Sequence, residues 1–416
     1  MKFKHFHLQH FILIMRSSIF RSSVYILSII LPIFILLWGC KTSNIPHSTL
    51  PDSRPIINAG DFSTIQMAVE ALPEEGGMVQ LPPGTFRISK PIHINKGDIY
   101  LQGAGPATHI INENKDHQPS LILSADSTEL KDTDPLWRVQ ISDLRITGNE
   151  DSGHGILARD INELFISRVT ISNHGEDGIR LDHCYENPRI THSNITYNKD
   201  VGLNLLGCHD IVVNGNEFEE NGDALHCTDG FNLTMSGNNL DDHIRHGVVI
   251  ENTYGSVVSG NMIEECQGTA IILDRDCYGI NLGGNVIAHD GIGVDLRDAH
   301  GIAVSANTFT INQDHGLLIR AGSGRITVSG NNFSDSYIGD NLVKRRPDDR
   351  RAGGLTLQGC RDVLISGNVF SGIHPGKAFS LEDDPINVVF RDNMIIDSDS
   401  DHEKLDDPLN TNVILD

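Results

Sequence analysis

The chain has 416 residues, and its 55 acidic and 32 basic side chains give a formal net charge of −23 at pH 7. This acidity argues against nucleic acid as a partner, because proteins that bind phosphate backbones present a basic surface. Forty glycines but only sixteen prolines favour a regular structure with many tight turns.

The N-terminus carries an apolar run, SSVYILSIILPIFILLWG, over residues 22–39, and Cys40 follows it directly. A basic start, an apolar segment and a small residue before a cysteine resemble a bacterial lipoprotein signal, whose cysteine is lipidated after cleavage. Residues 1–40 are therefore expected to be this signal, and the polar residues 41–54 a flexible tether. The alternative is an uncleaved signal anchor. Either way the rest of the chain is expected to be exported, and Lys41 after the cysteine favours the outer membrane or cell surface.

The six cysteines after Cys40 contain no C-x-x-C pair and no tight spacing. In a chain of this length they are expected to be small buried residues and not disulfides. No dedicated calcium motif occurs, so no cofactor and no metal site are expected, with Ca²⁺ left open.

Residues 55–125 are expected to form an N-terminal cap and the first structural repeats. Ser63 or Thr64 can cap a short helix, whose apolar residues share one face at Ile65, Ala68, Val69 and Leu72. Such a helix would cover the open end of a stack of strands, which otherwise exposes apolar side chains and unpaired edges.

From residue 126 to 396 the sequence repeats every 22–25 residues, apart from an insertion at 335–353. The asparagine of an S-G-N motif recurs at Asn194, Asn216, Asn238, Asn261, Asn285, Asn307, Asn331, Asn368 and Asn393. Apolar residues stand three positions before and two positions after the asparagine, as Val304 and Phe309 do around Asn307. A second motif, G-apolar-x-apolar, follows in most repeats.

Short alternating runs separated by glycine and asparagine are typical of strands. Three short strands and their turns account for one repeat, which predicts an all-β, single-stranded right-handed parallel β-helix of about ten coils with a short N-terminal capping helix. Stacked coils lie about 4.8 Å apart, so the asparagines can bond to one another along the stack. Residues 397–416 are expected to be a polar C-terminal tail.

These repeats resemble the pectate-lyase-like superfamily of parallel β-helix proteins across residues 140–395. The segments DFSTIQMAVEALP (61–73) and GGMVQLPPGTF (76–86) are similar to the first segment of many polysaccharide-cleaving β-helix enzymes. The resemblance implies the fold and a carbohydrate ligand. The signatures of polygalacturonase-type hydrolases and the Asp-Pro-His motif of alginate epimerases are absent, so the resemblance transfers no catalytic residue.

Functional side chains are expected at outward-pointing positions where the residue type departs from the repeat. The hypothesis places the catalytic carboxylates in three consecutive coils, at Glu251, Asp274 and Asp295. Neighbouring carboxylates would then lie about 5 Å apart and the outer two about 10 Å apart. Nearby cations and a stack of aromatic rings would bind substrate, at Arg275, Arg297, Arg320, Tyr254, Tyr278 and His300. The alternative is a solvated acidic face.

An apolar stripe on the same strands is predicted at Leu225, Val249, Ile272, Gly293 and Leu318. A loop such as 335–353 or 115–137, or a second subunit, is expected to cover it.

Two further groups are weighed against this ladder of carboxylates. One column could supply a general base, but a structural role in turns is the favoured interpretation. Its members are His154, His246, His315, Asp177 and Asp290. The dense run from Asp241 to His246, which includes Asp242 and His243, is the second choice for a site.

Three functions remain open at this stage. The first is an exported, membrane-tethered enzyme that cleaves a polysaccharide, either a glycoside hydrolase or a polysaccharide lyase. The second is a non-catalytic cell-surface scaffold or adhesin, and the third is a polysaccharide epimerase. The partners expected are a polysaccharide and, through the N-terminal lipid, a membrane. The oligomeric state stays open.

Overall fold

The computed structural model describes residues 52–125, 135–335, 351–396 and 413–415. The predicted signal, Cys40 and nearly all of the predicted tether lie outside the described residues, as do positions 336–350 of the insertion. The chain divides into two units, Met1–Pro51 and Asp52–Asp416, and the fold described below belongs to the second. Among the described residues, no helix is both long and apolar enough to span a membrane.

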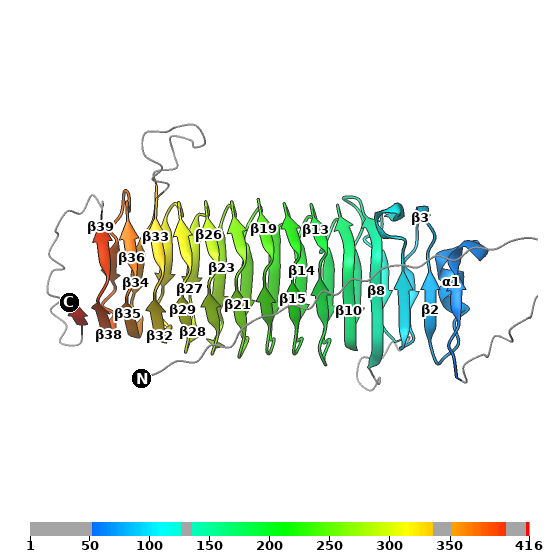
Figure 1. Cartoon of the computed structure of the whole chain (residues 1–416), viewed down its shortest axis with the longest axis horizontal. Helices are drawn as coiled ribbons and strands as arrows, with labels where there is room; N and C mark the ends of the chain where they lie inside the picture. Colours follow the sequence, from blue (N-terminus) through cyan, green and yellow to red (C-terminus); the bar gives the residue numbers. More distant parts are fainter. Residues whose placement is uncertain (1–51, 126–134, 336–350, 397–412, 416) are drawn as a thin grey trace, which may run out of the picture. The chain divides into compact units, whose positions relative to one another are not determined.

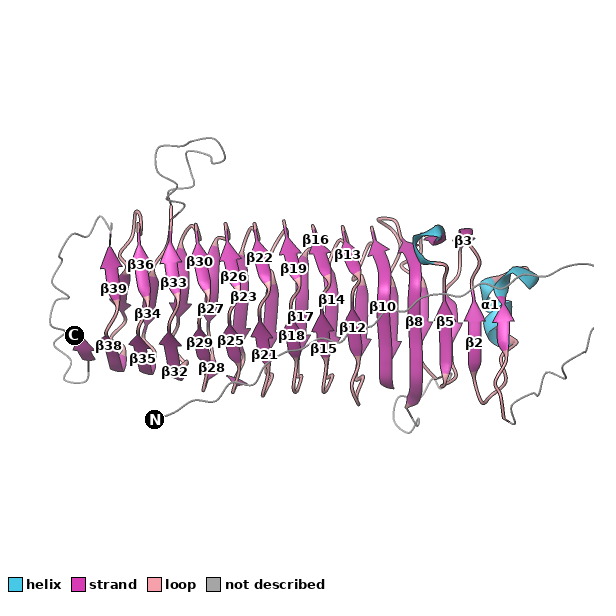
Figure 2. Ribbon diagram, in the orientation of Figure 1, coloured by secondary structure: helices cyan, strands magenta, loops and turns pink. Residues whose placement is uncertain are grey.

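Most coils of the second unit are built from three short strands. One representative coil consists of β15 (Val212–Asn214), β16 (Glu217–Glu219) and β17 (Asp223–Thr228). Each strand pairs in parallel with its counterpart in the next coil, which produces three sheets that we call the first, second and third faces (Figures 1 and 2). The predicted all-β parallel β-helix is therefore confirmed.

Within the described residues the third face contains twelve strands, so the coils outnumber the predicted ten. In chain order they are β4 (Ile92–Ile94), β7 (Leu121–Leu123), β9 (Ile156–Arg159), β11 (Ile179–Asp182), β14 (Val201–Leu206), β17, β20 (Val248–Glu251), β23 (Thr269–Asp274), β27 (Ile292–Leu296), β31 (His315–Ile319), β34 (Leu355–Gln358) and β37 (Phe379–Glu382).

The first and second faces join through two long strands, β8 (Leu136–Thr147) and β10 (Ile161–Ser172), which extend across both. The first face also contains β1 (Ile56–Asn58), β2 (Gly77–Gln80), β5 (Ile99–Gln102), β12 (Arg189–Thr191), β15, β18 (Thr234–Ser236), β21 (Val257–Ser259), β25 (Asn281–Gly283), β29 (Ala303–Ser305), β32 (Gly324–Ser329), β35 (Arg361–Ser366), β38 (Ile386–Arg391) and β40 (Val413–Leu415). The second face contains β3 (Gly84–Ile88), β6 (Thr108–Asn112), β13 (Asn194–Thr196), β16, β19 (Asn239–Asp241), β22 (Met262–Glu264), β26 (Val286–Ala288), β30 (Thr308–Thr310), β33 (Asn332–Ser334), β36 (Val369–Ser371) and β39 (Met394–Ile396).

A short helix, α1 (Ile65–Glu70), closes the N-terminal end of the stack, as the sequence predicts. The Thr64 hydroxyl accepts a hydrogen bond from the backbone N–H of Met67, so Thr64 is the N-cap. The apolar face of the helix is buried at Ile65, Ala68, Val69 and Leu72.

The predicted asparagine ladder forms at the corner between the first and second faces. The backbone N–H and the Nδ2 of Asn216 both donate to Oδ1 of Asn238, each at 3.0 Å, and Asn238 repeats this pattern with Asn261. The ladder continues to Asn393 and, from Asn216 onward, satisfies the polar backbone of the turn in each coil. The prediction that Asn194 belongs to this ladder is wrong. Asn194 pairs with Glu217 in the strand register, and Ser193 occupies the corner position in that coil.

Apolar side chains stack like on like inside the coils. Phe309, Phe333 and Phe370 form nearly parallel rings with centroid separations of 4.5 and 4.7 Å. The six described cysteines are free and buried, as predicted. The core therefore consists of columns of stacked apolar side chains, one of which contains this run of phenylalanine rings.

Replacement of Phe309 by aspartate should destabilise the protein by several kcal/mol, because Phe309 is buried in the ring stack and a carboxylate there would have no partner. Thr310 lies beside it on the same strand and points outward, so Thr310→Asp is the control and should stay within about 0.5 kcal/mol of wild type. Chemical denaturation measures both. Equal midpoints for the two variants would show that the inward and outward positions are wrongly assigned.

Candidate functional site

Three outward columns line the third face, and we number them in the order in which the chain passes them. Column 1 holds His154, Asp177, Val201, Asp223, His246, Thr269, Ile292 and His315. Column 2 holds Leu157, Arg180, Asn204, His226, Val249, Ile272, Asp295, Leu318, Thr356 and Ser380. Column 3 holds Arg159, Asp182, Leu206, Thr228, Glu251 and Asp274, followed by Arg297, Arg320, Gln358 and Glu382.

The predicted ladder of three carboxylates is only partly aligned. Glu251 and Asp274 are in register in adjacent coils, so their strands place them about 4.8 Å apart. Asp295 instead pairs with Ile272 and Leu318, which places it in column 2 and corrects the predicted register. The reason is visible in the motif G-V-D-L at 293–296, in which the aspartate fills the variable position and the next residue, Arg297, reaches column 3.

Asp295 serves as an anchor for two arginines. Its side chain is fully buried, with Arg297 Nε 2.9 Å from Oδ2. Arg320 donates to both oxygens at 2.7 and 3.0 Å. Because the carboxylate is enclosed by both guanidinium groups, it holds these arginines in place on the face.

Glu251 and Asp274 are also paired with cations. Glu251 lies 3.2 Å from Nε2 of His226 and 3.3 Å from Nε of Arg275. Asp274 accepts a hydrogen bond from the backbone N–H of Arg275 at 2.8 Å and lies 3.9 Å from Arg297. Arg275 and Arg297, which the sequence hypothesis assigns to substrate binding, thus lie beside these carboxylates.

The predicted apolar stripe needs correction. Val249, Ile272 and Leu318 do lie in column 2, yet all three are buried. Leu225 pairs with Val248 and is part of the core, and Gly293 precedes column 2 by two residues. The stripe is therefore shorter than predicted and is interrupted by Asp295.

The predicted aromatic stack lies at the corner between the third and first faces, next to column 3. Tyr254 pairs with Tyr278, and Tyr278 pairs with His300. The stack begins three coils earlier than predicted, because Tyr185, His209 and Phe231 continue it with ring centroids 4.6–5.4 Å apart. Phe231 and Tyr278 are 41% and 47% exposed. Sequence analysis missed the additional rings because they are not followed by the same turn residues.

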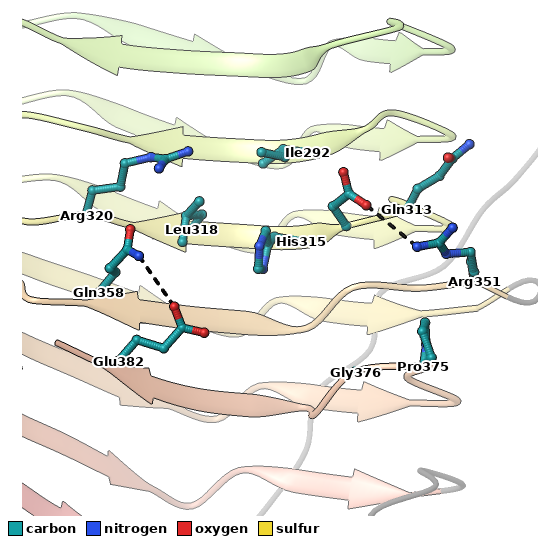
Figure 3. A pocket seen from close by; sticks show the side chains of 11 residues that line it. Ile292, Gln313, His315, Leu318, Arg320, Arg351, Gln358, Pro375, Gly376 and Glu382 are labelled. Carbon is teal, nitrogen blue, oxygen red and sulfur yellow. Dashed lines mark hydrogen bonds and ion pairs between the residues drawn. The ribbon is translucent and has the colours of Figure 1, made fainter.

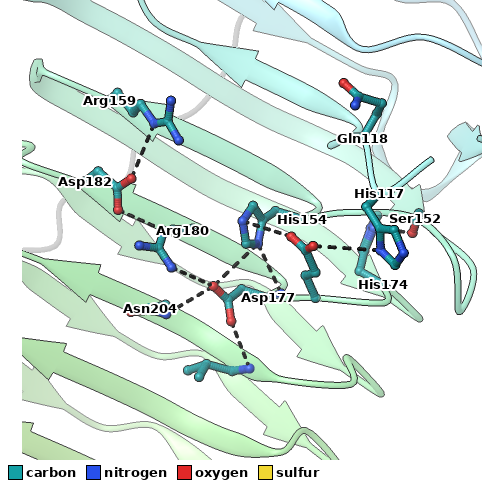
Figure 4. A network of polar contacts seen from close by, with 12 residues as sticks. His117, Gln118, Ser152, His154, Arg159, His174, Asp177, Arg180, Asp182 and Asn204 are labelled. Carbon is teal, nitrogen blue, oxygen red and sulfur yellow. Dashed lines mark hydrogen bonds and ion pairs between the residues drawn. The ribbon is translucent and has the colours of Figure 1, made fainter. Parts of the chain in front are cut away.

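A denser polar network lies at the N-terminal part of the third face, around β9 and β11 (Figure 4). The backbone N–H of Asp177 donates to Nδ1 of His154 at 3.2 Å, so the neutral ring carries its proton on Nε2, 3.1 Å from Glu176. The carboxylate of Asp177 accepts from the N–H of Val201 and from Nδ2 of Asn204, both at 3.1 Å.

Arg180 connects this network to a second carboxylate. Its guanidinium lies 3.8 Å from Asp177 and donates through Nε to Asp182 at 2.9 Å. Arg159 approaches the other oxygen of Asp182 at 3.4 Å. The carboxylates of Asp177 and Asp182 thus flank one guanidinium on the outward side of the third face, where Asp177 is nearly buried (Figure 4).

Burial moves the pKa values of both central groups in this network. The side chain of Asp177 is 2% exposed, and burial raises its pKa to about 6. Burial, reinforced by Arg180, lowers the pKa of His154 to about 4, so the ring is neutral at neutral pH. Asp177 therefore exchanges a proton near neutral pH, although the sequence favours a turn role for this column.

The other predicted groups are dispersed by the fold. Asp290 lies inside the coil, where the N–H of Cys266 donates to it at 3.0 Å, and not in column 1, which Ile292 occupies in that coil. Asp242 is exposed at a corner, His243 faces the interior, and His246 lies in column 1. The run from Asp241 to His246 is therefore not one site.

One acidic corner has the ligand types of a cation site. Glu264, Glu265 and His289, and likewise Asp241, Asp242 and Glu265, offer ligand atoms within 4.8 Å of one another. The hydrogen bond with Asp242 raises the pKa of Glu265. Exposed acidic groups often gather without an ion, so Ca²⁺ binding stays an open expectation.

A pocket of about 420 Å³ lies at the C-terminal part of the third face (Figure 3). Its lining residues are Ile292, Gln313, Asp314, His315, Leu318, Arg320, Arg351, Gln358, Pro375, Gly376 and Glu382. Of the predicted site residues, only Arg320 contributes to it. Sequence analysis missed the pocket because two of its walls come from segments that do not repeat.

Comparisons with known proteins agree with this geometry. The family model for the right handed beta helix region matches residues 129–287, 186–333 and 271–402, which confirms the predicted right-handed winding. The A-module of the mannuronan C-5 epimerase AlgE6 from Azotobacter vinelandii has a TM-score of 0.57 at 15% identity, covering 82% of this chain and 98% of the module. The catalytic domain of Agl-KA has a TM-score of 0.58 at 15% identity, covering 82% of this chain and 69% of that domain. Tailspike protein 3 of bacteriophage CBA120 has a TM-score of 0.56 at 12% identity, covering 83% and 62%.

At these identities the solved structures show likeness of fold alone. A search of curated proteins finds no match to the chain.

The burial of Asp295 predicts that this carboxylate stabilises the fold, whereas Asp274 contributes little to stability. Asp295→Asn should lower the free energy of unfolding by about 1.5–3 kcal/mol, because the buried carboxylate that holds two partly exposed guanidinium groups is lost. Asp274→Asn is the control, and at its more exposed position the cost should stay below about 1 kcal/mol. Thermal and urea unfolding measure both. Equal stability of the Asp295→Asn variant and wild type would contradict the anchor.

Proposed function

Because the chain belongs to the right-handed β-helix family, we propose that it binds a polysaccharide along the third face and hydrolyses it at Asp177 and Asp182. The observation that carries this proposal is the buried outer-face carboxyl of Asp177, whose pKa of about 6 suits a proton donor near neutral pH. One structural neighbour is named for its action on a polysaccharide, mannuronan, which supports a polymer as the ligand.

The pairing of cations on this face favours hydrolysis over lyase or epimerase chemistry. Both of those reactions remove a proton next to a sugar carboxylate, and an uncompensated cation must stabilise the charge that develops. In the part of the chain that the structure describes, each column 3 arginine is already paired with a carboxylate: Arg159, Arg297 and Arg320. Arg180 in column 2 is paired as well. Arg159 and Arg180 share Asp182, and Arg297 and Arg320 share Asp295, so each guanidinium group of columns 2 and 3 has a carboxylate neighbour, and we take a neutral sugar polymer as the substrate.

The two carboxylates divide the chemistry of hydrolysis between them. Protonated Asp177 gives its proton to the glycosidic oxygen as the bond to the anomeric carbon breaks. Asp182, held by Arg159 and Arg180, takes a proton from the water that attacks the anomeric carbon. Arg180 lies between the two carboxylates, 3.8 Å from Asp177 and 2.9 Å from Asp182, so we assign the inverting reaction, in which water and not a carboxylate attacks the anomeric carbon.

This mechanism predicts a loss of activity with rising pH. On a polysaccharide hydrolysed by the wild type, kcat/KM should fall as pH rises through about 6, because Asp177 loses the proton that it must donate. Asp177→Asn should lower turnover at least about a hundredfold. A reducing-end assay over a polysaccharide panel, combined with product stereochemistry by NMR, measures both effects.

The control for that experiment is Asp210→Asn, which changes an exposed aspartate at a corner and should retain wild-type turnover. Glu251→Gln and Asp274→Asn test the carboxylate pair predicted from the sequence. If these two variants lose activity and Asp177→Asn retains it, the reacting centre is the pair in column 3. New reducing ends accompanied by the absorbance of unsaturated uronates would establish a lyase, whereas hydrolysis produces new reducing ends without that absorbance.

We also propose that the protein is exported and tethered by a lipid at Cys40, on the grounds of the apolar run before that cysteine. Cys40→Ser should abolish fatty-acid labelling and release the protein from membranes, because the serine offers no thiol to lipidate. Metabolic labelling and membrane fractionation measure this, with Cys208→Ser, at a buried cysteine of the fold, as the control for a general cysteine effect. Equal labelling of Cys40→Ser and wild type would contradict the lipid anchor.

A further inference from the structure

The pocket at the end of the third face differs from the rest of the surface in its construction. It spans the coils of β27, β31, β34 and β37, and β37 is the last strand of that face. One wall is formed by Arg351, and another by Pro375 and Gly376 (Figure 3).

An antiparallel contact joins these two walls. The N–H of Ala352 donates to the carbonyl of His374 at 2.8 Å, and the N–H of His374 donates back at 3.1 Å. All other strand pairs in the described part of the chain are parallel. The regular repeat is thus interrupted at the position of the pocket.

The surface of the pocket combines apolar and polar groups in the way that sugar recognition requires. Ile292, Leu318 and Pro375 supply apolar contact for the C–H face of a pyranose ring. Gln358 donates to Glu382 at 3.4 Å, and these planar side chains point toward the pocket from adjacent strands (Figure 3). An amide and a carboxylate of this kind can each bond two neighbouring hydroxyl groups of a sugar.

The charges at the rim select for a neutral ring. Arg320 is held by both oxygens of Asp295, and Arg351 lies 3.7 Å from Asp314. Glu382 has the uncharged Gln358 as its partner in this pocket. A uronate would therefore place its carboxylate against the carboxylate of Glu382 without a compensating arginine.

We propose that this pocket is a subsite for one neutral hexopyranose unit of the polymer, an inference that rests on the proposed function. Its volume of about 420 Å³ falls in the range of pockets that enclose small ligands. Six coil steps separate β11, which carries Asp182, from β31, so the pocket lies about 29 Å from the reacting carboxylates. The substrate is therefore a chain of several neutral sugars that extends along the helix axis.

Saturation-transfer NMR on the whole protein tests the subsite, with the methyl glycosides of glucose, mannose and galactose and with free glucuronate as probes. We expect at least one neutral glycoside to give a signal, and glucuronate to give none. Glu382→Ala should lower the neutral signal at least tenfold, and Glu382→Gln should restore it and admit glucuronate. Glu219→Ala, at a glutamate on the second face, is the matched control and should match wild type.

The subsite is overturned if no neutral glycoside gives a signal, if glucuronate equals the neutral probes, or if Glu382→Ala leaves the signal unchanged. Failure of the proposed function has a different signature. In that case the Asp177→Asn variant still degrades the polymer at the wild-type rate, while the NMR signals of the neutral glycosides are still lowered by Glu382→Ala.

Discussion

The register of stacked coils is the constraint on which the rest of the structure depends. At each corner turn, Asn216 and its counterparts fix one coil against the next, because both a backbone N–H and a side-chain N–H donate to the same oxygen. Once that register is fixed, every residue lies above its equivalent, and columns of like side chains follow. The aromatic core stack and the three outward columns of the third face are consequences of this one interaction.

Much of the fold could be predicted from the sequence because the repeat is local. The spacing of asparagine and its apolar neighbours defines the parallel β-helix, and the capping helix follows from Thr64 and the apolar face behind it. The errors arose where the repeat alone gives an ambiguous register. Asn194 was displaced by one residue and Asp295 by two, since turns of variable length allow either alignment until the hydrogen bonds of neighbouring strands decide.

The candidate site shows the opposite limit. Sequence analysis placed charged side chains on the third face, including Arg297, Arg320 and Asp274, yet it could not show which charges are already paired. It assigned His154 and Asp177 to turns, because the burial that moves their pKa values cannot be inferred from residue type. The walls of the pocket at Arg351 and Pro375 lie in segments without a repeat, so no periodicity could reveal them. The ion pairing and the burial of the charged side chains depend on the register of the coils. These two properties are the basis for choosing between hydrolysis and lyase or epimerase chemistry.

The central claim is that one sugar chain lies along the third face, with the bond to be broken at Asp177. Crystals of the Asp177→Asn variant soaked with an oligosaccharide of the hydrolysed polymer test it most directly. The account predicts density along columns 1 to 3, with a glycosidic oxygen within hydrogen-bond distance of residue 177. Density on the first or second face, or a chain that passes Glu251 and Asp274 without reaching residue 177, would contradict it.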